Sequence, residues 1–167
     1  MLAHLYVQPR LLARFLQSAS DVEPEVGATE NLAGTRTFKD LIDSSAREGA
    51  VLDKFDLGVP LAEARTLVLG ADLDSTIGTL QGSISISDYL ITRCVEAVVH
   101  GGDLVDPVAP DEAAQSITSA ALLRVLSVTA PELVAAARAL PIEEWIDVAT
   151  GRVAASGHLA AATPVMA

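Results

Sequence analysis

Residues 88–104 read DYLITRCVEAVVHGGDL, and this stretch decides both the fold class and the candidate chemistry of the chain. On a helix that turns about 100° per residue, its charged side chains fall within an arc of roughly 80°. The members of this polar stripe are Arg93, Glu96, His100 and Asp103. Apolar residues occupy most of the remaining helix surface, which is typical of a buried helix. We therefore expect the stripe to face the interior of the protein, where charged groups need partners or a metal.

Glu96 and His100 are four residues apart, so both side chains can point at one ion. Carboxylate and imidazole are ligands that suit zinc and other divalent transition metals. Alone, the spacing is common, and the simpler interpretation is a hydrogen-bonded pair on a partly exposed helix. A metal site also needs a third ligand. The other histidines are His4, which shares a helix face with apolar residues as a core histidine would, and His158, for which a surface position is expected.

The composition predicts a single helical domain over residues 1–167. Half of the 167 residues are hydrophobic and only 4% are aromatic, which favours helices over sheets. The net charge of −11 disfavours nucleic acid and anionic membranes as partners. No apolar run approaches the ~20 residues of a membrane-spanning helix. With one cysteine, Cys94, and no signal-peptide pattern, we expect a soluble cytoplasmic protein.

Hydrophobic periodicity and capping residues place the elements along the chain. The expected helices cover residues 2–18, 37–55, 88–104, 111–128, 131–140 and 142–149. Ser87 is the expected N-cap of the third helix, and residues 19–34 read as a loop. The strand-like patterns RTLVLG (65–70) and GSISIS (82–87) predict a short β-hairpin or irregular loop near 65–86. Residues 151–167 form a weakly structured tail.

The third-helix stretch resembles the signature of the mycothiol-dependent maleylpyruvate isomerase family, within the DinB-like metal-binding superfamily. The matching residues are Thr92, Arg93, Glu96, His100, Asp103 and Leu104. The early LAHL (2–5) and the late WIDVATGR (145–152) are similar to further parts of the family pattern, in the same order. The resemblance therefore covers almost the whole chain.

The resemblance implies a DinB-like four-helix bundle that holds one divalent metal, most often zinc, through His4, Glu96 and His100. Three protein ligands leave an open position, as catalytic metal sites do. In the family this position takes the thiol of mycothiol. Arg93 and Asp103 would then orient a ligand or the substrate, and an ion pair within or between helices is an equally good interpretation of both.

The implied activity is that of a mycothiol-dependent transferase or isomerase acting on a small electrophile. The alternative is a non-catalytic helical protein that binds a ligand or partner and keeps a vestigial metal site. The family's usual first helix has no counterpart before Leu2, so we expect an apolar groove along the remaining bundle. A second copy of the chain, a partner or a missing N-terminal segment would cover it. The full isomerases carry a further C-terminal domain, which disfavours maleylpyruvate itself as the substrate.

Overall fold

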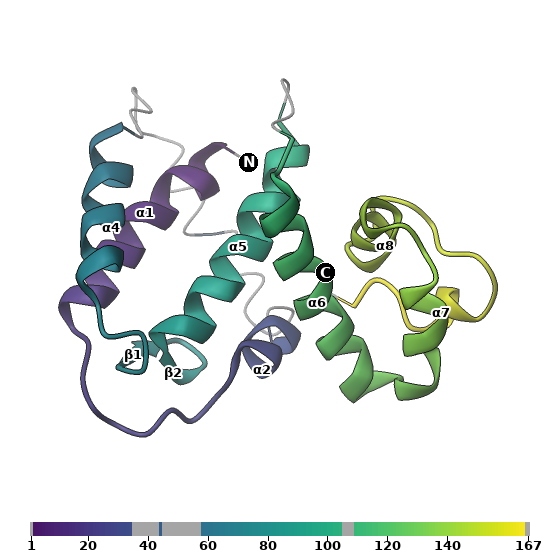
Figure 1. Cartoon of the computed structure of the whole chain (residues 1–167), viewed down its shortest axis with the longest axis horizontal. Helices are drawn as coiled ribbons and strands as arrows, with labels where there is room; N and C mark the ends of the chain where they lie inside the picture. The colour runs from purple at the N-terminus through teal and green to yellow at the C-terminus, as the bar shows by residue number, and fades with distance from the viewer. Residues whose placement is uncertain (1, 35–43, 45–57, 105–108, 166–167) are drawn as a thin grey trace.

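A computed structural model describes residues 2–34, 44, 58–104 and 109–165, and of residues 2–7 the helical backbone. Most of the described chain is helical, which confirms the predicted all-α class with a small hairpin (Figure 1). The helices are α1 (Leu2–Gln17), α2 (Ala28–Ala33), α4 (Gly58–Gly70), α5 (Ile86–Gly102), α6 (Glu112–Thr129), α7 (Val134–Arg138) and α8 (Ile142–Ala149). The helix predicted at 37–55 lies outside the described residues.

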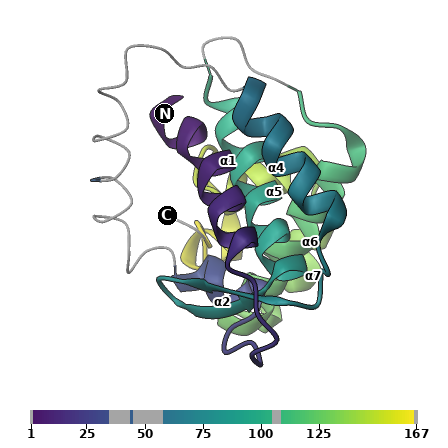
Figure 2. The ribbon, with the colours of Figure 1, turned by 90° about the vertical axis from the view of Figure 1, so that its left-hand side faces the viewer.

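Helix α5 runs through the middle of the fold, between two groups of elements (Figure 1). On one side α6 packs along it, and α8 packs against α6. On the other side lie α1, the hairpin and α4, and Figure 2 shows α1 and α4 side by side. The larger core sits between α5, α6 and α8 and includes the buried side chains Val95, Leu122, Leu126, Trp145 and Ala149. Trp145 is only 1% exposed and is the largest side chain of this core.

The hairpin comprises β1 (Thr76–Thr79) and β2 (Gly82–Ser85), paired antiparallel with Ile77 opposite Ile84. Both isoleucines are buried in a smaller core with residues of α1 and α5. The prediction of a hairpin near 65–86 is therefore confirmed at its second half. The strand-like pattern at 65–70 is wrong as a strand, because these residues end α4. A short apolar run does not distinguish a strand from a helix, and packing against α1 decides the outcome here.

Helix α5 begins directly after the hairpin, two residues earlier than predicted. Its N-cap is Ser85, whose side chain accepts a hydrogen bond from the backbone N–H of Asp88 at 3.1 Å. Ser87 is therefore not the cap, since β2 ends at Ser85 and the chain turns straight into the helix. Helix α6 begins at Glu112, one residue after the predicted start, and Asp111 is its N-cap, accepting a hydrogen bond from the N–H of Ala114 at 2.7 Å.

Two segments are more ordered than the sequence predicts. The loop expected at 19–34 contains α2, where Glu30 accepts a hydrogen bond from the N–H of Gly27 and Leu32 is buried in the larger core. The tail at 151–167 contains a 3-10 helix, Gly157–Ala161, that buries Leu159. In each case one apolar residue contacts a core built from distant elements, which local pattern does not reveal.

Candidate metal centre

Three titratable side chains at the C-terminal end of α5 contact one another in a row. His100 Nε2 lies 3.1 Å from Glu96 Oε2, and His100 Nδ1 lies 3.3 Å from Asp103 Oδ2. Glu96 is four residues before His100 and Asp103 is three residues after it, so the helix itself brings the three groups together. This part of the predicted polar stripe is therefore a continuous contact network.

The side chains of this network are partly buried: 12% of the Glu96 side chain and 24% of the His100 side chain are exposed. The hydrogen bond to Glu96 raises the pKa of His100 above its ordinary value, although burial opposes the shift. Burial would raise the pKa of Asp103, but hydrogen bonds from Arg152 and His100 leave it lowered. Both carboxylates thus favour a proton on the imidazole, and a cation that binds Nε2 has to displace that proton.

The donor atoms fit a divalent metal. Zinc holds imidazole nitrogen and carboxylate oxygen at about 2.0–2.2 Å, so two such atoms on a tetrahedral ion lie roughly 3.3–3.5 Å apart. The observed 3.1 Å between Glu96 Oε2 and His100 Nε2 needs only a small widening. The contact of His100 Nδ1 with Asp103 matches the carboxylate–histidine pairing that orients imidazole ligands in metal sites.

The third predicted ligand, His4, lies in the first turns of α1, whose backbone alone is described. Helix α1 runs antiparallel to α5, because Phe15 contacts Tyr89 with ring centroids 5.6 Å apart and Gln8 accepts a hydrogen bond from Arg93. Position 4 shares the helix face of Gln8, one turn nearer the N-terminus. The arrangement directs this end of α1 toward the C-terminal half of α5 (Figure 1). Among the side chains that the structure describes, no three metal-binding groups converge.

Arg93 lies on the same stripe but in a different environment. Its guanidinium stacks over the Tyr89 ring at 4.8 Å and donates hydrogen bonds to Gln8 and, at 3.2 Å, to Thr92 Oγ1. Tyr89 is buried, and this burial raises the pKa of its phenol. Arg93 thus joins α5 to α1, and its predicted role toward a substrate stays a prediction.

Asp103 forms an ion pair with Arg152, one of the two interpretations that the sequence allows for this residue. Arg152, just after α8, places Nη2 at 2.6 Å and Nε at 2.9 Å from Asp103 Oδ1. Sequence reasoning missed Arg152 as a site residue, because it lies 49 residues from Asp103 and no local pattern joins them. The one available signal was its place in WIDVATGR, where it follows a helix-ending glycine.

The remaining histidine lies where the sequence predicts, and the cysteine lies outside the polar stripe. His158 is exposed on the 3-10 helix of the tail. Cys94 projects away from the polar stripe, with Sγ 3.8 Å from the carbonyl oxygen of Ala114, and burial raises the pKa of its thiol. A raised pKa keeps the thiol protonated near neutral pH, which is typical of an unreactive, partly buried cysteine.

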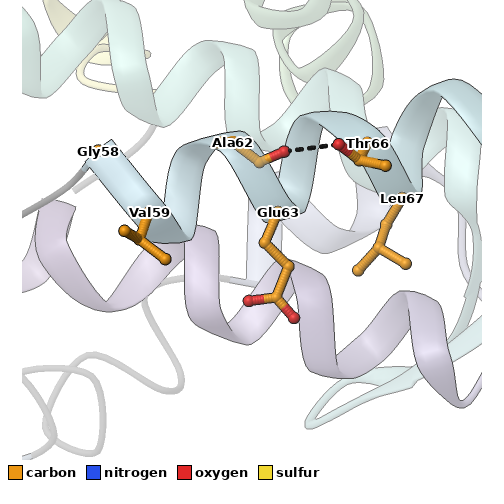
Figure 3. A pocket seen from close by; sticks show the side chains of 6 residues that line it. All are labelled: Gly58, Val59, Ala62, Glu63, Thr66 and Leu67. Atoms are coloured by element: carbon orange, nitrogen blue, oxygen red, sulfur yellow. Dashed lines mark hydrogen bonds between the residues drawn. The ribbon is translucent and has the colours of Figure 1, made fainter.

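A separate open groove runs along α4 (Figure 3). Its walls are mainly apolar, and the side chains of Val59, Glu63 and Leu67 project to the same side of the helix. Val59 is 71% exposed, although valine is usually buried. None of the lining residues belongs to the polar stripe, so this groove and the candidate metal centre are two different features.

Comparison of the chain with protein-family models, with curated proteins and with solved structures gives no match. Within the described ranges, no helix is both long enough and apolar enough to cross a bilayer.

Proposed function

We propose that the chain is a metal-binding protein of the DinB-like type, in which His4, Glu96 and His100 hold one divalent metal, most often zinc. The contact of Glu96 Oε2 with His100 Nε2, at 3.1 Å, carries this proposal. The second ring nitrogen of His100 is turned to Asp103, which leaves Nε2 on the side of Glu96. His4 is the proposed third ligand because it belongs to the start of α1, whose backbone runs antiparallel to α5.

The proposed reaction class is attack of a low-molecular-weight thiol on a small electrophile, in a mycothiol-dependent transferase or isomerase of the maleylpyruvate isomerase family. Bound zinc would lower the pKa of a thiol at its open position and so supply thiolate near neutral pH. Glu96 and His100 would fix the ion, while Asp103 keeps the imidazole oriented. Arg93, held beside Tyr89, would orient an anionic group of the thiol or electrophile.

Metal analysis tests the site. The purified full-length chain should contain close to one equivalent of zinc after exposure to the ion and dialysis. His100→Ala and His4→Ala should each lose this zinc, whereas His158→Ala should retain it, because His158 is exposed on the tail. A wild-type chain without zinc, or equal zinc in His100→Ala and His158→Ala, would refute the proposed site.

Thiol dependence tests the reaction. The zinc-loaded chain should convert a small electrophile, such as a maleyl or halogenated compound, only when mycothiol is present, and His100→Ala should not. Cys94→Ala should leave this rate unchanged, because Cys94 projects away from the stripe and its thiol pKa is raised. Zinc binding without any thiol reaction across the panel would contradict the enzymatic part of the proposal.

The α4 groove favours a second candidate function, a non-catalytic helical protein that binds a ligand or partner. Val59, which lines the groove, is more than half exposed, and so are two further apolar residues of α4 outside its lining, Leu61 and Leu69. Such a surface is typical of an interaction site, including one between copies of the same chain. Sedimentation of the wild type and of Val59→Asp would distinguish a monomer from an assembly that uses this face.

A further inference from the structure

A route of direct contacts leads from the end of α8 to the imidazole of His100. Arg152 contacts Oδ1 of Asp103, and the other carboxylate oxygen of Asp103 contacts His100 Nδ1. Each oxygen therefore serves one partner. A carboxylate held from one side in this way has little freedom to rotate away from the imidazole on the other.

The guanidinium is itself fixed by several partners. Its Nη1 donates to Thr150 Oγ1 at 3.0 Å, and its Nη2 also donates to the carbonyl oxygen of Val99, in the last turns of α5. This carbonyl belongs to the group that lacks intrahelical partners at a helix end, where a cation is also favoured by the helix dipole. Arg152 thus binds Asp103 and the backbone of α5 at once.

The backbone that presents Arg152 is a helix-ending turn. The N–H of Gly151 donates to Val148 at 3.2 Å and the N–H of Arg152 donates to Asp147 at 2.9 Å, the pair of bonds that defines a Schellman motif. Gly151 has φ +78°, a conformation that glycine adopts at little cost. Helix α8 is anchored by buried Trp145 and Ala149, so the turn projects Arg152 from a fixed base.

We propose that Arg152 is a positioning residue of the metal centre: through Asp103 it holds the His100 ring with Nε2 directed toward Glu96 and the ion. This inference rests on the proposed metal site. It adds a residue 49 positions away from Asp103, on a separate helix end, to the groups that set metal affinity. Arg152 would contact neither the ion nor a substrate, and it would act only through the Asp103 carboxylate that orients His100.

Zinc affinity of the full-length chain, measured by competition with a chromophoric chelator, tests the proposal. Arg152→Gln should weaken zinc binding about 10–100-fold, the effect typical of residues that orient a metal ligand. Arg152→Lys should restore part of the loss, because lysine keeps the charge but not the two-point contact. Arg138→Gln, on an exposed arginine in the last turn of α7, is the matched control and should bind zinc like the wild type.

A double-mutant cycle separates positioning from a general effect on folding. If Arg152 acts through Asp103, adding Arg152→Gln to Asp103→Ala should cause no further loss of zinc affinity. Additive losses, or unchanged affinity in Arg152→Gln with zinc still lost in His100→Ala, would overturn this inference and leave the metal site standing. Absence of zinc from the wild type would overturn both. Unfolding curves of the zinc-free variants would show that each is folded under the conditions of the titration.

Discussion

Both halves of α5 have one polar stripe among apolar residues, but the two halves lie in different environments. Residues 86–93 lie against the hairpin and α1, where Tyr89 is buried, meets the Phe15 ring edge to face and lies under the Arg93 guanidinium. Residues 94–102 present Glu96 and His100 in a half-buried network that continues through Asp103 to the end of α8. One polar stripe thus has a half that joins α5 to α1 and a half in which a carboxylate and an imidazole lie side by side. Position on a helix face thus predicts which groups are neighbours, while the packing around each turn determines which contacts they make.

The largest expected effect is a difference in the free energy of unfolding between a variant of the N-terminal half of α5 and a variant of its C-terminal half. Tyr89→Ala removes a ring that is 4% exposed and should lower the free energy of unfolding by about 3 kcal/mol, as other buried aromatic truncations do. His100→Ala, in zinc-free protein, should cost less than about 1 kcal/mol, because it removes only partly exposed ion pairs. Urea unfolding of both variants, with Tyr89→Phe as the control that keeps the ring, measures the difference. Equal losses in the two alanine variants would remove the distinction between the halves.

The second effect concerns the turn that brings Arg152 to the C-terminal half. Gly151→Ala should lower the free energy of unfolding by about 1–2 kcal/mol, because the positive φ strains any L side chain. An added Cβ would also meet Pro164 at 3.3 Å. Gly157 has φ +60° but open space around a Cβ, so Gly157→Ala is the control for the strain alone. Thermal unfolding should rank Gly151→Ala as the less stable variant, and the reverse order would contradict the described turn.

The smallest expected effect is a pH dependence of stability that arises from the C-terminal half of α5. The pKa of His100 is raised in the folded state, so zinc-free protein gains stability from this group below pH ~6.5, and the gain disappears as the pH rises through the folded pKa. For a partly exposed pair the gain is about 0.2–1 kcal/mol. The difference in unfolding free energy between wild type and His100→Ala should therefore be larger at pH 6 than at pH 9. A difference that grows with pH would have the wrong sign for the Glu96–His100–Asp103 network.

Local signals in the sequence predict part of the fold. Helix α8 appears at the predicted residues, and α6 begins within one residue of its predicted start at Asp111, because apolar spacing and capping chemistry act over a few residues. Residues 65–70 are helical despite their strand-like pattern, since contact with α1 overrides it. The buried Leu32 of α2 shows the same limit, because its core neighbours come from distant elements.

The candidate site also has contacts that the sequence predicts and contacts that it does not. The neighbourhood of Glu96, His100 and Asp103 follows from helix geometry alone, so the sequence predicts it. The contact of Asp103 with Arg152 depends on how α8 sits relative to α5, and no spacing within one element encodes that. The packing of α1 against α5 likewise depends on tertiary contacts. His4 belongs to the predicted ligand set because of the family resemblance and not because of its spacing from α5.

X-ray absorption at the zinc edge of the loaded, full-length chain measures the proposed ligand set directly. With His4, Glu96 and His100 as ligands, we expect a shell of nitrogen and oxygen atoms at about 2.0–2.1 Å, with the outer scattering of imidazole rings and no sulfur. Adding mycothiol should introduce one sulfur at about 2.3 Å. A sulfur in the shell before any thiol is added, or a chain that binds no zinc, would contradict the claim that the C-terminal half of α5 is a metal centre.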